Sequence, residues 1–145
     1  MIETIIIIGI GLAGGLAVGT QAPIAGAMAQ RVGGASSSFI VHVGGTVASL
    51  ILLVARGGEH IQDWRNLPWY MLGCGAFGLA LYLSLSQTVP RFGATAAITL
   101  LIVGQLLAGI VIDHFGAFDV PVRALDVNRL AAVVLLLAGA WLMVR

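Results

Sequence analysis

Long, almost uncharged apolar runs constrain this chain more than any other feature. Runs of about 18 or more apolar residues are typical of membrane-spanning helices, whereas runs of about 10 to 14 more often form core helices of soluble proteins. Only 9% of the residues are charged and 59% are hydrophobic, which leaves too little polar surface to cover a soluble core. The sequence predicts an all-α integral membrane protein with a single transmembrane domain, residues 1–145. Its five transmembrane helices are expected at residues 5–28, 36–54, 69–89, 94–112 and 130–144.

The connections between these stretches are short. Residues 90–93, Pro-Arg-Phe-Gly, predict a tight turn that makes the third and fourth spans an antiparallel hairpin. The last span is the shortest, but Arg129 and Arg145 bracket it, and long arginine stems can reach both membrane interfaces. Glu3 and the length of the first apolar run disfavour a cleavable signal peptide.

Charge and cysteine content exclude several classes of function. The net charge is +1 and the arginines form no cluster, so no nucleic-acid partner is expected. Cys74 is the only cysteine, so no disulfide or cysteine metal site within one chain is possible. The histidines, His42, His60 and His114, fall in separate elements. We therefore expect no enzyme, no catalytic residue, no metal site and no cofactor.

Small residues and a proline mark the first span. Gly11, Gly15 and Gly19 recur every four residues and predict a helix-packing face. Pro23 cannot donate a hydrogen bond to the Gly19 carbonyl, so these two residues predict a helix break of the kind that builds transporter sites. The alternatives are ordinary helix packing for the glycines and a simple kink at the proline.

Polar residues inside the spans are few, and several fall at similar depth. At 1.5 Å per residue, Gln21 lies roughly 15 Å, His42 roughly 9 Å, Tyr82 roughly 12 Å and Gln105 roughly 18 Å from the side that carries Arg31 and Arg91. Together with Thr20, these residues are candidate substrate-binding groups near the membrane midplane. The alternative is that they only form hydrogen bonds between helices.

His42 is also a candidate for proton coupling, because histidine is the side chain that ordinarily changes charge near neutral pH. The alternative is a neutral histidine fixed by one interhelical hydrogen bond. The spans contain no deep carboxylate. This disfavours an antiport mechanism in which a central Asp or Glu exchanges protons for a cationic substrate.

Several motifs together resemble a known family. They are Pro68-Trp69, residues 73–78 (Gly-Cys-Gly-Ala-Phe-Gly), residues 90–94 (Pro-Arg-Phe-Gly-Ala), Gly104-Gln105-Leu106 and residues 113–116 (Asp-His-Phe-Gly). In these motifs the chain resembles the short YdcZ-type family of the drug/metabolite transporter superfamily, assigned as bacterial inner-membrane exporters. The resemblance implies a five-helix unit equivalent to half of an EamA-like transporter with inverted repeats. It also implies a multi-pass location in the bacterial inner membrane.

A five-helix unit of this kind needs a second unit to form a complete transporter, and the distribution of the arginines indicates how the two are oriented. Of the seven, Arg56, Arg65, Arg123 and Arg129 fall on one side of the predicted membrane, and Arg31, Arg91 and Arg145 on the other. This near-balance gives little preference for either orientation. We expect a small-molecule exporter subunit that works in the lipid bilayer as an antiparallel, dual-topology homodimer. The alternatives are one half of a heterodimeric transporter and a non-transporting scaffold or accessory subunit.

Overall fold

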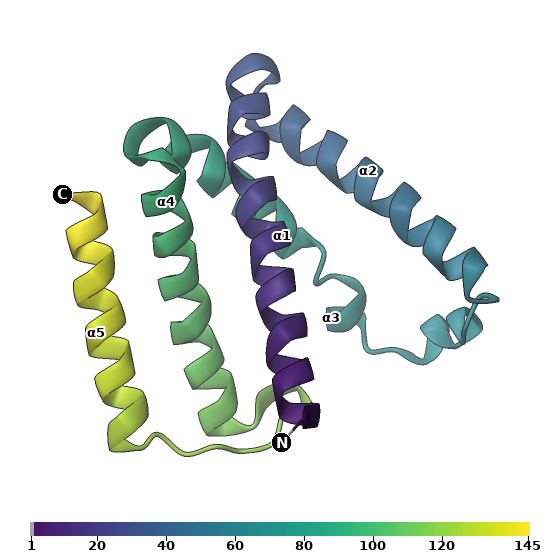
Figure 1. Ribbon diagram of the computed structural model, residues 1–145. Coiled ribbons are helices and arrows are strands. Elements are labelled where there is room, and N and C mark those ends of the chain that lie inside the picture. Colours follow the sequence, from purple (N-terminus) through teal and green to yellow (C-terminus); the bar gives the residue numbers. More distant parts are fainter. Residues whose placement is uncertain (1) are drawn as a thin grey trace. The chain divides into compact units, whose positions relative to one another are not determined.

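The computed structural model describes residues 2–145, and this part of the chain contains helices and no strand (Figure 1). The all-α prediction is confirmed. The elements in order are α1 (Ile2–Val32), α2 (Gly34–Ala55), η1 (Ile61–Asn66), α3 (Trp69–Leu72), α4 (Ala76–Phe115), η2 (Ala117–Asp119) and α5 (Val127–Val144).

Four stretches are long and apolar enough to cross a membrane: α1, α2, Trp69–Phe115 and α5. Trp69–Phe115 contains 47 residues, and a straight helix of that length would extend about 70 Å at 1.5 Å per residue, more than twice the ~30 Å bilayer core. Within it, Gly93 leaves helical conformation, with φ 79° and ψ 169°. This stretch therefore supplies two crossings separated at Gly93, which gives the five-helix membrane fold expected from the sequence.

The third expected span, residues 69–89, is not one continuous helix. A turn over residues 73–75 separates α3 from α4. Short-range bonds replace part of the regular helical ladder here: the Cys74 N–H donates to the Met71 carbonyl at 3.4 Å and the Gly78 N–H to the Gly75 carbonyl at 3.0 Å. Glycines at 73 and 75 weaken the helix because each loses more backbone entropy on ordering than alanine does.

The prediction of a broken first helix is wrong for this structure. α1 is helical throughout Ile2–Val32 and holds Pro23 inside it. Proline removes one backbone donor, and helical bonds on either side of that position hold the element together. Gly19 and Pro23 therefore match the alternative, a proline accommodated within a membrane helix.

The described chain forms two compact units, one ending at Pro90 and the other comprising Arg91–Arg145. In the first, α1 and α2 meet at the Gly33 turn, where φ is +87°, and diverge from there (Figure 1). The Ser37 hydroxyl donates to the Ala25 carbonyl at 3.0 Å, and both residues are buried. The core of this unit therefore lies near the α1–α2 turn, where small residues let the two backbones approach closely.

The first segment of α4 packs against this same junction. Gln30 of α1 donates to the Ser86 carbonyl at 3.0 Å. A Cβ placed at Gly26 would lie 2.9 Å from Val89 side-chain atoms, and one at Gly34 would lie 2.9 Å from the Ser86 hydroxyl oxygen. Larger residues at these two glycines would force the three helices apart.

The second unit joins the end of α4 to α5 through polar contacts. The Asp126 carboxylate accepts a hydrogen bond from the Arg129 N–H at 2.7 Å, which caps the start of α5. The Arg129 guanidinium lies 3.2 Å from the Asp113 carboxylate, and the Arg123 N–H donates to the Asp113 carbonyl at 2.8 Å. These bonds hold the connection between the last two spans.

Candidate functional site

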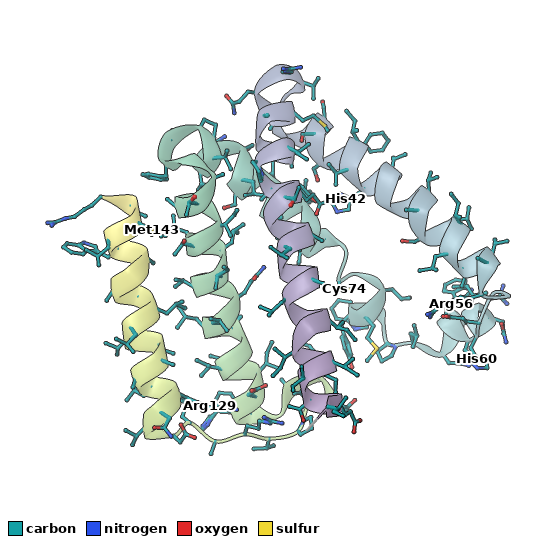
Figure 2. All side chains as sticks on the ribbon, viewed as in Figure 1. His42, Arg56, His60, Cys74, Arg129 and Met143 are labelled. Atoms are coloured by element: carbon teal, nitrogen blue, oxygen red, sulfur yellow. The ribbon has the colours of Figure 1, made fainter. Side chains whose placement is uncertain are left out.

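Three elements of the first unit line one open cavity of 570 Å³. Gln21 reaches it from α1 and Tyr82 from α4. The other lining residues come from α2, among them His42, which is labelled in Figure 2. The other lining residues are Val41, Gly45, Thr46, Ser49, Leu50 and Leu53. The structure thus brings together three of the five residues predicted to bind substrate.

One face of α2 carries the polar wall of the cavity. His42, Thr46 and Ser49 are spaced by four and three residues, which places them on one side of a helix. Sequence reasoning identified His42 but missed Thr46 and Ser49. The spacing from His42 was the signal that would have found them.

The imidazole of His42 is held by its own helix and by α4. Its Nδ1 lies 2.6 Å from the Ser38 carbonyl oxygen and 3.3 Å from the Ser38 hydroxyl. A carbonyl only accepts, so Nδ1 carries the hydrogen, and in the neutral ring Nε2 is left as an acceptor. The fixing bond is therefore within α2, unlike the interhelical bond considered from the sequence.

Two residues of α4 face the same imidazole. The ring of Tyr82, which is buried, makes an edge-on contact with it at a centroid distance of 5.5 Å and an interplanar angle of 76°. Gly78 lies directly against the ring, so that a Cβ at this position would collide with Nε2. Because Gly78 has no side chain, there is room for the His42 ring next to α4.

Thr20 and Gln105 lie elsewhere. The Thr20 hydroxyl donates to the Leu16 carbonyl at 2.9 Å, and its side chain lines a shallow hollow on α1 that also includes Gln21. Gln105 is exposed on α4 in the second unit and is not among the residues lining the 570 Å³ cavity. Its participation in the same site as Gln21 stays a prediction.

A second cavity, of 410 Å³, lies between α4 and α5 in the second unit. Its walls are apolar except for Asp113 and Arg129, which form the ion pair at 3.2 Å. Both side chains are about one-third exposed, at 32% and 28%, and such pairs contribute little to stability, about 0–1 kcal/mol. This cavity is a helix-packing groove with an anchoring ion pair.

The residues that the structure describes include no group of three or more His, Cys, Asp or Glu side chains placed to hold a metal ion. The polar groups of the α1–α2–α4 cavity are amide, imidazole, hydroxyl and phenol. Groups of this kind bind and orient a solute by hydrogen bonding.

Sequence comparison places the chain among known proteins. Residues 6–142 match the family described as "Putative inner membrane exporter, YdcZ". The chain belongs to this family. It is also 32% identical over 92 residues to inner membrane protein YdcZ of Escherichia coli strain K12. That alignment covers 63% of this chain and 59% of the relative, so the chain spans less than two thirds of that protein's length. No solved structure matches the chain.

Family membership confirms the resemblance found in the sequence motifs and the inner-membrane location. It agrees with the apolar helices, four stretches of which are long enough to span a bilayer. The family description names an exporter and no substrate. The α1–α2–α4 cavity is the feature of this chain in which polar side chains from three helices line one space.

Proposed function

We propose that this chain is a small-molecule exporter subunit of the bacterial inner membrane, and that the α1–α2–α4 cavity binds its substrate. The observation that carries the proposal is the cavity itself, in which Gln21, His42 and Tyr82 from three membrane helices line one space. Polar side chains in lipid are costly unless they have partners. A substrate that satisfies them accounts for polar groups collected around an open space.

We further propose that the working form is an antiparallel homodimer. Among the described residues, no atom lies within 4 Å of a Cβ built at Gly11, Gly15 or Gly19, so this face of α1 is unoccupied within one chain. A second copy packed there would allow close contact between helix backbones. An inverted pair would also supply the two-fold relation on which many transporters base alternating access.

The transport proposal is tested with purified protein in liposomes. We expect saturable transport of one or more solutes from a metabolite panel, and a decrease of roughly 5- to 100-fold in Gln21→Ala, because a hydrogen bond to substrate is lost. The same decrease is predicted for Gln105→Ala if both glutamines contact substrate. Gln62→Ala in η1, outside the cavity, is the matched control and keeps the rate of the unmodified protein.

Two outcomes would contradict this assignment. If Gln21→Ala and Gln105→Ala both leave transport unchanged while the protein still assembles, the glutamines do not bind substrate. If no solute of the panel moves, although the reconstituted protein is folded, the alternative of a non-transporting scaffold or accessory subunit is favoured.

A further inference from the structure

Three of the five polar residues that line the α1–α2–α4 cavity use their hydrogen-bond donors within the protein. The Thr46 hydroxyl donates to the His42 carbonyl at 2.8 Å, and the Ser49 hydroxyl donates to the Gly45 carbonyl at 2.8 Å. The His42 Nδ1–H donates to the Ser38 carbonyl at 2.6 Å. The two hydroxyl oxygens then have only lone pairs left for a ligand, and the remaining imidazole acceptor, Nε2, lies against Gly78.

Gln21 and Tyr82, the other two polar residues, still leave more acceptors than donors open to a ligand. Within residues 2–145, no hydrogen bond is made by the side chains of Gln21 and Tyr82, so both are available. The amide supplies donors and an acceptor, and the phenol supplies one donor and can accept. Gln21, Thr46, Ser49 and Tyr82 therefore offer acceptors to the cavity, and only Gln21 and Tyr82 also offer donors.

The cavity is also uncharged. Its described lining residues include no Asp, Glu, Lys or Arg. An anion would have no cationic partner in this wall, and the only donors open to it are those of Gln21 and Tyr82. An organic cation would have no carboxylate to offset its desolvation away from water.

From these observations we infer that the α1–α2–α4 cavity selects an uncharged solute that presents hydrogen-bond donors beside an apolar part. The solute's N–H or O–H groups meet the hydroxyl oxygens of Thr46 and Ser49, beside the imidazole of His42. Its apolar part lies against the side chains of Val41, Leu50 and Leu53, which also line the cavity. The inference rests on the proposed function, because it assumes that this cavity is the substrate site.

Gly78 is a positioning residue for this site. Because it has no Cβ, the His42 ring can lie against α4 while its Nδ1–H stays bonded to Ser38. An alanine at this position would displace the ring and with it the Nε2 acceptor. Gly75 is the matched control, since no described atom lies within 4 Å of a Cβ built there.

Four probes separate the ligand classes: benzamide, benzoate and benzamidinium, which are nearly isosteric, and N,N-dimethylbenzamide, which is larger by two methyl groups. Benzamide is uncharged and has N–H donors, the dimethyl compound lacks those donors, and the other two carry opposite charges. Binding is measured by ligand-observed NMR with the full chain in lipid nanodiscs, and empty nanodiscs correct for partitioning into lipid. We expect benzamide to bind saturably, at least roughly fivefold more tightly than N,N-dimethylbenzamide and roughly tenfold more tightly than either ion.

Histidine labelled with ¹⁵N gives a direct signature of the contact. The chain has three histidines, and the His42 signals are assigned by their loss in His42→Gln. Benzamide should shift the Nε2 resonance of His42 and leave those of His60 and His114 in place. Gly78→Ala should alter the His42 signals and weaken benzamide binding by roughly tenfold, whereas Gly75→Ala should do neither.

The inference is overturned if benzoate or benzamidinium binds as tightly as benzamide, if N,N-dimethylbenzamide binds equally well, or if benzamide shows no saturable binding. It is also overturned if benzamide binds without moving the His42 resonance. Other outcomes would contradict the proposed function independently of the ligand class. Benzamide bound at His42 with no transport of any solute contradicts the exporter proposal alone, whereas transport of anions through the intact protein contradicts the ligand class alone.

Discussion

Among the described residues that line the α1–α2–α4 cavity, only His42 can take up a proton to become a cation, since the other polar groups of the cavity are amide, hydroxyl and phenol. Its Nδ1–H is already bonded to Ser38, so an added proton goes to Nε2. Protonation turns the acceptor that faces Gly78 into a donor and places a charge where no described lining residue is a carboxylate. The binding properties of the cavity therefore depend on the state of this one ring.

We predict that substrate transport falls as pH decreases from about 8 to about 5, and that His42→Gln removes this dependence. The sign follows from the loss of the Nε2 acceptor in acid. Transport rates in liposomes across this range measure the effect, with His60→Gln and His114→Gln as controls outside the cavity. A profile of His42→Gln identical to that of the unmodified protein would remove His42 from the mechanism.

The sequence predicted some of the cavity residues for a simple physical reason. Gln21, His42 and Tyr82 are polar positions within apolar runs, and all three line the space that the structure describes. Thr46 and Ser49 were missed because a hydroxyl that donates to its own helix is common in membrane helices, so that only their spacing from His42 distinguishes them. The contact of His42 with Gly78 was not predictable, because it depends on how closely α2 approaches α4.

Among the elements, the long helix α4 shows how backbone conformation separates two spans. Gly93 has φ +79° and ψ 169°, a combination essentially confined to glycine. The turn expected at residues 90–93 was recognisable from its proline and glycine, although Pro90 itself lies inside the helix. The turn at residues 73–75 was not predicted, and the sequence left open whether Pro23 breaks α1, because propensity alone does not decide whether neighbouring bonds hold a helix together.

We predict that Gly93→Ala lowers the stability of the protein by about 1–3 kcal/mol, because alanine is strained at this φ and ψ. Gly104→Ala is the matched control: Gly104 is helical, and no described atom lies within 4 Å of a Cβ built there. Alanine there should be neutral or stabilising by about 0.5–1 kcal/mol. Thermal unfolding in mild detergent, followed by tryptophan fluorescence, measures both variants. Equal melting temperatures for the two would contradict a special conformation at Gly93.

For the whole molecule, one chain leaves much of its apolar helix surface without protein contact. The most apolar window of α1 has 0% of its residues buried, and those of α2 and α5 have 6%. The sequence indicated this result through its long apolar runs, which need lipid or another protomer around them. The sequence does not show whether lipid or another protomer covers a given helix face, because lipid tails and helix surfaces are equally apolar.

We predict that the chain inserts in both orientations and functions as an inverted pair. Four arginines on one side of the membrane against three on the other leave little orientational bias, since Arg and Lys in short loops decide topology during insertion. A C-terminal reporter should therefore give signal from both sides of the membrane. Signal from one side only would contradict dual topology and would favour a heterodimer in which a separate homologue supplies the opposite orientation.

Locking the orientation tests the same prediction through function. Extra arginines in the turn that follows Arg31, or in the one at Arg91, should hold that side in the cytoplasm and abolish transport when the variant is expressed alone. Matched glutamine insertions at the same turns control for disturbance of the loop and should leave transport intact. Co-expression with a copy locked in the opposite orientation should restore transport, because the two locked chains together rebuild the inverted pair. A locked chain that transports alone at the normal rate would show that one orientation is sufficient, and the antiparallel homodimer would be wrong.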